Sequence, residues 1–135
     1  MRDAVIFDMD GLLLDTERLS LEAYQKACEQ FGIAYDQDLY FSLIGCTMQK
    51  CEEVLSDALT HQPLDDFFAA WNELYAKEAL DKPVPLKSGV QSLLNHLTHL
   101  DIPCGIATST ELDKATRKLT NAGIIGYFKI FATGD

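Results

Sequence analysis

The sequence has 135 residues, of which 47% are hydrophobic and 24% are charged, and its formal net charge is −10 at pH 7. This composition is typical of a folded globular protein, and the length suits one domain of ordinary size. A strongly negative protein repels nucleic acids and anionic membranes, so we expect neither as a partner. A phosphate ester would be repelled as well, which indicates a bound cation or local hydrogen-bond donors wherever one binds.

The cysteine pattern and the apolar runs bear on the cellular compartment. Four cysteines stand at positions 28, 46, 51 and 104 and form no CxxC pair. Reduced thiols of a cytoplasmic protein explain them better than disulfides do. The sequence opens without a basic segment followed by an apolar run, and no apolar run reaches the length of a membrane span. We therefore expect no signal peptide and no membrane segment.

The first predicted element is a buried strand over residues 3–8, where apolar and partly β-branched residues precede an Asp-Met-Asp-Gly run. From Thr16 the apolar residues recur at helical spacing, and Gly32 is expected to end this helix. Residues 35–45 are expected to form a loop.

Two further helices are predicted, one capped by Thr47 and one starting at about Asp65. Aromatic residues recur along the latter helix at helical spacing, which is more typical of a core face than of a ligand-binding box. They are Phe67, Phe68, Trp71 and Tyr75. Residues 82–85, Lys-Pro-Val-Pro, break the pattern and indicate a linker.

The remaining sequence alternates helices and strands. Ser88 is expected to begin a helix, and residues 102–107 a strand. Thr110 and Asp113 resemble a capping box at the start of the next helix, and residues 127–132 form the last predicted strand.

Such alternation is typical of parallel strands joined by helical crossovers. We therefore predict an α/β fold, a partial Rossmann-like parallel sheet of three strands. Residues 1–15 and 84–135 form its core domain, and residues 16–83 form an inserted helical cap subdomain.

A pair of aspartates ends the first strand. Asp8 and Asp10 are two positions apart, so their side chains leave the strand on the same face and can converge. Ligands bind at the carboxyl ends of parallel strands. Two adjacent carboxylates favour a cation, and oxygen ligands suit Mg²⁺. Gly11 permits a sharp turn without a side chain in the way. An Asp-rich surface turn is the alternative for this motif alone.

Hydroxyl residues end the second strand. The hydroxyl of Thr108 and the backbone N–H groups of Ser109 and Thr110 precede a helix, whose N-terminus can seat a phosphate oxygen. Capping of the helix is the alternative role. Beside the acidic strand end, phosphate binding becomes the favoured interpretation.

Residues 7–17, Phe-Asp-Met-Asp-Gly-Leu-Leu-Leu-Asp-Thr-Glu, resemble the first motif of haloacid dehalogenase-like hydrolases. They resemble most the β-phosphoglucomutase-like branch, in which a helical cap follows that motif. The resemblance implies that Asp8 attacks phosphorus to form an aspartyl-phosphate. It implies that Asp10 protonates the leaving oxygen and then activates water. Mg²⁺ would be held by the Asp8 carboxylate and the Asp10 backbone carbonyl.

Residues 106–109 resemble the second motif of the same family. The resemblance implies that Thr108 and Ser109 bind the transferring phosphoryl group, with Gly11 at the same phosphate site. It also implies that the cap loop around Gly45 selects the leaving group and excludes water.

Two further motifs of the family, one with a Lys and one with acidic residues, lie beyond its third strand, where this sequence stops. Lys114 and Lys118 are the nearest substitutes for the Lys and are expected to face solvent. Without two further strands, residues 4–7 would be an unpaired apolar edge that promotes self-association. We therefore interpret the sequence as a shortened chain, a proteolytic product or the product of a disrupted gene. Its catalytic activity on its own is expected to be weak or absent.

The mutases of this branch carry a His and an Arg where this sequence has Ser20 and Met48. The expected function is therefore Mg²⁺-dependent hydrolysis of a small phosphorylated metabolite. A sugar phosphomutase and a catalytically incompetent binding or regulatory fragment are the alternatives. The residues around Glu17 and Arg18 also resemble pseudouridine-5'-phosphatases.

Overall fold

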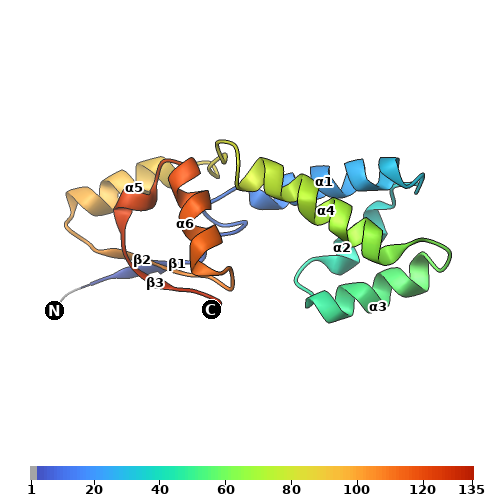
Figure 1. Ribbon diagram of the computed structural model, residues 1–135. Helices are drawn as coiled ribbons and strands as arrows, with labels where there is room; N and C mark the ends of the chain where they lie inside the picture. Colours follow the sequence, from blue (N-terminus) through green and yellow to red (C-terminus); the bar gives the residue numbers. More distant parts are fainter. Residues whose placement is uncertain (1–2) are drawn as a thin grey trace. The chain divides into compact units, whose positions relative to one another are not determined.

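The computed structural model describes residues 3–135 and divides into two compact units (Figure 1). The first unit holds the residues up to Leu19 and those from Ala76 on, and the second is Ser20–Tyr75. The divisions fall within helices α1 (Thr16–Gln30) and α4 (Leu64–Ala79). The predicted linker over residues 82–85 therefore lies inside the first unit.

The first unit contains a parallel sheet of three strands, β1 (Val5–Phe7), β2 (Cys104–Ala107) and β3 (Phe128–Ala132). The strands lie in the order β1-β2-β3, with both pairs parallel. The predicted α/β class with three parallel strands is confirmed.

Two helices cover one face of this sheet. Helix α5 (Val90–His99) precedes β2, and α6 (Leu112–Asn121) with a 3-10 turn (Ile125–Tyr127) connects β2 to β3. Both connections step in the same direction across the sheet, and right-handed connections of this kind place their helices on the same face. Figure 1 shows α5 and α6 on one side of the strands. The buried side chains between these layers include Phe7, Leu94, Ile106, Leu119 and Phe128.

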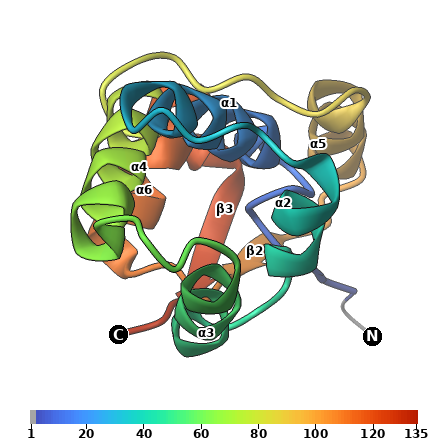
Figure 2. The same cartoon turned by 90° about the vertical axis from the view of Figure 1, so that its right-hand side faces the viewer.

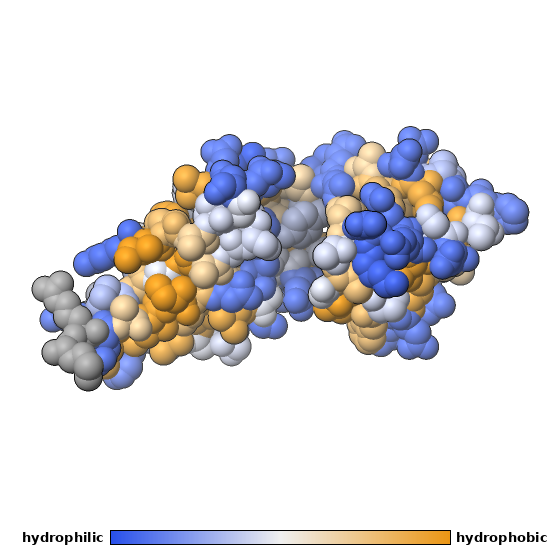
Figure 3. All heavy atoms as spheres, turned by 90° about the horizontal axis from the view of Figure 1, so that it is seen from below, coloured by the Kyte–Doolittle hydropathy of each residue, from blue (hydrophilic) through white to orange (hydrophobic). Residues whose placement is uncertain are grey.

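The opposite face of the sheet is apolar, and none of the helices described within residues 3–19 and 76–135 covers it. Ile6, Gly105 and Ile130 lie side by side across the three strands. Ile6 is 57% exposed and Ile130 is 64% exposed, and Figure 3 shows the apolar surface on this side. A Cβ atom on Gly105 would lie 2.8 Å from Cδ1 of Ile6, so the glycine lets the isoleucine side chain lie across the middle strand.

The second unit is built around an aromatic core. It contains most of α1 and α4 together with α2 (Gln37–Leu43) and α3 (Met48–Ala58) (Figure 2). The ring of Tyr24 lies 5.6 Å from that of Phe67 and 5.0 Å from that of Trp71, both edge-on. Burial raises the pKa of the Tyr24 hydroxyl, so this residue remains neutral. Phe67 is fully buried, and the predicted core face of this helix is confirmed.

The predicted loop over residues 35–45 is wrong, because α2 lies there. The side chain of Asp36 caps this helix by accepting hydrogen bonds from the N–H groups of Asp38 and Leu39, and Tyr40 and Leu43 are buried. Seven residues make only two turns, too few for a clear apolar period. The predicted cap of the next helix is confirmed, since the Thr47 side chain accepts from the N–H of Lys50.

The segment that returns to the sheet is bonded to the loop after β1. The N–H of Asp15 donates to the carbonyl of Pro85, and the N–H of Lys87 donates to that of Leu13, both at 2.9 Å. On the other side, the Asn121 amide donates to the carbonyl of Leu80 at 2.6 Å. The first two bonds tie the loop that carries the aspartates to the segment before α5, and the third ties the residues at the end of α4 to α6.

All four cysteines are free thiols, and three of them, Cys28, Cys51 and Cys104, are buried. Burial raises the pKa of each of these three thiols. Buried thiols with a raised pKa are poor nucleophiles, so they act as small apolar core residues. Within residues 3–135, no helix combines the length and the apolar character needed to cross a bilayer.

Candidate active site

The loop after β1 is a compact turn held by its own backbone. The carbonyl of the buried Met9 accepts hydrogen bonds from the N–H groups of Leu12, Leu13 and Leu14 at 3.0–3.3 Å. Gly11 has a φ of 76°, which glycine adopts at little cost. Its N–H donates to the carbonyl of Leu14 at 2.9 Å. A Cβ atom on Gly11 would lie 2.6 Å from a carboxylate oxygen of Glu17, so the space beside the glycine is taken by that side chain. The predicted part of Gly11 in phosphate binding stays a prediction.

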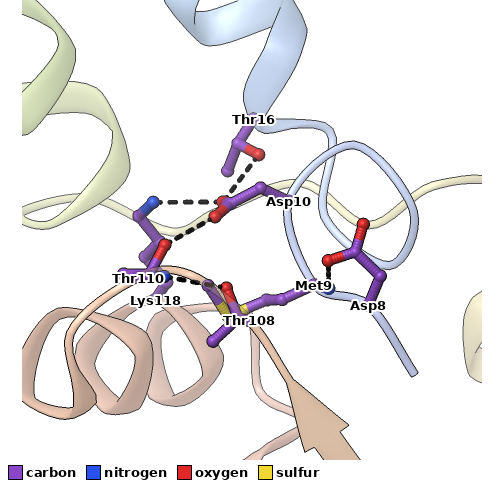
Figure 4. Close-up of polar contacts among 7 residues, drawn as sticks. All are labelled: Asp8, Met9, Asp10, Thr16, Thr108, Thr110 and Lys118. Carbon is purple, nitrogen blue, oxygen red and sulfur yellow. Dashed lines mark hydrogen bonds and ion pairs between the residues drawn. The ribbon is translucent and has the colours of Figure 1, made fainter. Parts of the chain in front are cut away.

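Asp10 is held by three side chains (Figure 4). Its Oδ1 accepts from the hydroxyl of Thr16 at 2.9 Å and from the ammonium group of Lys118 at 3.0 Å. Its Oδ2 accepts from the hydroxyl of Thr110 at 2.9 Å. The Asp10 side chain is 32% exposed and that of Lys118 is 6% exposed. The carboxyl end of β1 and the segment that follows β2 therefore meet at this carboxylate.

Asp8 lies in a different environment. It is exposed, and its Oδ1 accepts a hydrogen bond from the N–H of Met9 at 2.9 Å. Figure 4 shows its side chain turned to that amide, apart from the contacts around Asp10. One aspartate is thus anchored by neighbouring side chains, while the other is open to a ligand from solvent.

The predicted capping box at Thr110 and Asp113 is wrong. The N-cap of α6 is Glu111, whose side chain makes no capping hydrogen bond. The hydroxyl of Thr110 donates to Asp10 instead, and its N–H donates to Oγ1 of Thr108 at 3.2 Å. Of the donors predicted for phosphate, the Thr110 amide is therefore engaged, and Ser109 is exposed at the tip of the turn.

Residues 133–135 lie against the start of α6. A carboxylate oxygen of Asp135 accepts from the N–H of Leu112 and from the hydroxyl of Thr133, both at 2.8 Å. The N–H of Gly134 donates to the carbonyl of Thr110 at 3.0 Å. A Cβ atom at position 134 would lie 1.9 Å from the carbonyl oxygen of Ser109, so only glycine fits. A carboxylate at a helix N-terminus is favourable for both partners.

We expect the cap at Asp135 to depend on pH. The hydrogen bond from Leu112, followed by that from Thr133, lowers the pKa of Asp135 below its ordinary value of 3.8. A lowered folded-state pKa means that the contribution to stability is complete above pH 3.8 and is lost as the pH falls through the folded value. The amide resonance of Leu112 should therefore shift upfield in acid, followed by proton–nitrogen NMR.

Two variants sharpen that measurement. Asp135→Asn should remove this titration of the Leu112 resonance, whereas Asp113→Asn, one residue further along the same helix, should leave it in place. A Leu112 resonance that titrates equally in both variants would contradict the cap.

Lys118 does not face solvent, and the prediction that it does is wrong. The residue is buried and in contact with Asp10, whereas Lys114 on the same helix is exposed. Sequence reasoning missed this because a buried lysine is rare. The contact also joins positions 108 apart in the sequence, beyond the reach of any local pattern.

The described residues do not complete a metal site by themselves. Within residues 3–135, no three His, Cys, Asp or Glu side chains come together in a way that could hold a metal ion. Mg²⁺ commonly uses one or two carboxylates and keeps several waters. Asp8 is the exposed carboxylate here, while the Asp10 carboxylate already faces an ammonium group. Within the described residues the predicted magnesium site therefore has the exposed carboxylate of Asp8, and the part of the Asp10 backbone carbonyl stays a prediction.

Gly45 lies in the second unit, between α2 and α3. Its φ is 78°, and no atom lies within 4 Å of the position where a Cβ would be. Glycine is required here by the backbone rather than by a close neighbour. The role of this loop in substrate selection stays a prediction.

The fold and the site together define a class. An aspartate pair follows the first strand of a parallel α/β sheet, hydroxyl residues follow the second strand, and a helical unit is inserted between them. The sequence pattern of the haloacid dehalogenase-like hydrolase family matches residues 5–135. The chain belongs to this family.

Individual proteins agree with this result. A phosphorylated carbohydrates phosphatase of Thermotoga maritima is 32% identical over 98% of this chain and 62% of its own length. A probable pseudouridine-5'-phosphatase of Drosophila melanogaster is 33% identical over 84% of this chain and 48% of its own. A crystal structure assigned provisionally as a beta-phosphoglucomutase of Thermotoga maritima has a TM-score of 0.79 and 31% identity, with 98% of this chain and 62% of that one covered. The predicted resemblance to this family and branch is confirmed, and the chain spans about three fifths of the first relative.

Proposed function

We propose that the protein hydrolyses phosphate monoesters of small metabolites through an aspartyl-phosphate on Asp8. One observation carries the proposal: an exposed aspartate lies at the carboxyl end of β1, two residues before an aspartate held by Thr16, Thr110 and Lys118. The name of the Thermotoga relative, a phosphatase of phosphorylated carbohydrates, supports the class of substrate.

The reaction divides into two displacements. In the first, a carboxylate oxygen of Asp8 forms a bond to phosphorus, the ester oxygen leaves, and Asp10 in its acid form gives that oxygen a proton. In the second, water attacks phosphorus and gives its proton to the Asp10 carboxylate. The bond to Asp8 then breaks, and inorganic phosphate is released. Thr108 and the Ser109 amide bind the phosphoryl oxygens, and Gly11 permits the sharp turn of the loop beside them.

Mg²⁺ is the proposed cofactor. The net charge of −10 and the exposed Asp8 both call for a cation before a phosphate dianion can approach. Bound beside Asp8, the ion would screen the charges of nucleophile and substrate, with further oxygen ligands beyond those of the described residues. A cytoplasmic location is proposed along with this activity.

Product analysis tests the proposed function. The protein is incubated with Mg²⁺ and a set of sugar phosphates, and the products are followed by phosphorus NMR. Free inorganic phosphate, released slowly by this chain alone, is the expected product. A rearranged sugar phosphate would identify a phosphomutase instead, which is the second candidate because of the Thermotoga beta-phosphoglucomutase structure. Binding without any product would favour a regulatory fragment.

We also propose that the chain self-associates through the unpaired edge of β1 together with the apolar face beside it. Ile6 and Ile130 are exposed on that face, and β1 is an edge strand within residues 3–135. The double variant Ile6→Thr/Ile130→Thr keeps β-branched side chains and removes most of the apolar surface. Its mass by light scattering should fall to that of the monomer.

A matched control is Leu93→Gln, which changes an exposed leucine on α5, outside the sheet. It should leave the association unchanged. A wild-type chain that stays monomeric up to its solubility limit would contradict the association.

A further inference from the structure

We propose that Lys118 is a positioning residue that orients the Asp10 carboxylate for the hydrolysis of the aspartyl-phosphate. The inference rests on the proposed function, since it concerns the second displacement of that reaction. The sequence suggests Lys118 only as one of two substitutes for a family lysine and predicts that it faces solvent, so its role follows from where the fold places it.

Both carboxylate oxygens of Asp10 are held by donors that belong to the first unit. Lys118 and Thr16 contact Oδ1, and Thr110 contacts Oδ2, all at 2.9–3.0 Å. The three donors come from different elements, which are the start of α1, the loop after β2 and the second turn of α6. A carboxylate bonded through both oxygens cannot rotate freely about its Cβ–Cγ bond (Figure 4). The orientation of the Asp10 carboxylate plane is therefore set by these three donors.

The burial of Lys118 is costly and calls for a reason. A lysine is almost never buried unless it is paired, because its ammonium group loses water. An apolar side chain at such a position is often as stable or more stable, so the pair is weak evidence for a role in stability. Helix α6 already supplies Ala115 and Leu119 to the core. The ammonium group at position 118 is thus better explained by what it does to Asp10.

The second displacement depends most on that orientation. Asp10 must take a proton from water at the moment when the oxygen of water bonds to phosphorus, and this requires a lone pair aimed at the water. The first displacement depends on Asp10 only when the leaving group needs a proton. Acetyl phosphate has a good leaving group, so its transfer to Asp8 proceeds without help from an acid.

These two steps can be measured separately. The protein is loaded with acetyl phosphate in the presence of Mg²⁺, excess reagent is removed, and the phosphorylated fraction is followed by intact mass. Lys118→Gln keeps a side chain that can reach Asp10 and removes the charge. We expect decay of the adduct to slow by about 10- to 100-fold while loading changes less than about threefold. Asp10→Asn should show the same pattern.

Two matched variants separate charge from packing. Lys118→Arg keeps the cation and should retain decay within about threefold of wild type. Lys114→Gln changes an exposed lysine of the same helix and should behave as wild type. If Lys118→Gln does not fold, Lys118→Met takes its place, because it also removes the charge and should show the same slow decay with little change in loading.

Each result has one meaning. Decay in Lys118→Gln at the wild-type rate overturns the inference and leaves the proposed function standing. Loading that falls as much as decay identifies Lys118 as a ligand of the phosphoryl group or as a structural residue, and also overturns it. A wild-type chain that never gains a phosphoryl group overturns the proposed function and this inference together.

Discussion

Replacement of Asp8 by Asn is expected to remove the phosphoryl adduct and to lower phosphate release by about 10⁴-fold or more, as for other nucleophile deletions. The amide has the shape of the carboxylate but is a poor nucleophile, so no covalent bond to phosphorus forms. Asp8 is exposed, and its side chain accepts a hydrogen bond from the N–H of the adjacent Met9. The substitution should therefore leave the fold intact. Intact mass after treatment with acetyl phosphate measures the adduct directly, even where turnover is slow.

The control for this substitution is Asp3→Asn, which changes another exposed aspartate of the same unit before β1. It should retain the adduct and the rate. An adduct that persists in Asp8→Asn would place the nucleophile elsewhere and would remove the main support for the proposed mechanism.

The substitution Phe67→Ala should have the largest effect on stability, a loss of about 3–5 kcal/mol in the free energy of unfolding of the second unit. Phe67 is 0% exposed and lies edge-on to both Tyr24 and Phe31. Its removal leaves a cavity that the Tyr24 ring cannot fill without losing its contacts with Tyr40 and Trp71. The single tryptophan, Trp71, packs in the same core, so its fluorescence in urea reports on this unit.

Phe41→Ala is the matched control, since Phe41 is 50% exposed on α2. Its substitution should cost less than about 1 kcal/mol, as is usual for surface positions. Equal losses for the two variants would show that the aromatic cluster is not the core of this unit.

Much of the fold was predictable from local patterns. The three strands and the long helices follow from apolar spacing, and Thr47 caps its helix as its residue type indicates. The predicted burial of the first strand is wrong for one of its faces, since Ile6 is 57% exposed. The short helix α2 was not predicted, because two helical turns are too few to show a periodic pattern of apolar residues. The start of α6 was placed wrongly, because Thr110 has a stronger acceptor in Asp10 than in its own helix. The first residue of α6 is therefore determined by a tertiary contact and not by the capping preference of Thr110.

The candidate site was predictable only in part. The aspartate pair and the hydroxyl residues are recognisable as motifs, since each lies at the end of a strand. Lys118 carries no such signal, because its burial depends on a partner at the other end of the sequence. The unequal environments of Asp8 and Asp10 also needed the structure, since alternation along a strand gives both side chains the same direction.

The contacts of Asp10 have a consequence for the order of folding. Its bonds to Thr110 and Lys118 join positions 100 and 108 apart, with the whole helical insertion between them. Closing a loop of that length is slow compared with forming a helix, and it waits for late parts of the chain to leave the ribosome. The insertion can therefore collapse around its aromatic residues while Asp10 is still hydrated and unpaired. Catalytic competence becomes one of the last properties that the polypeptide acquires.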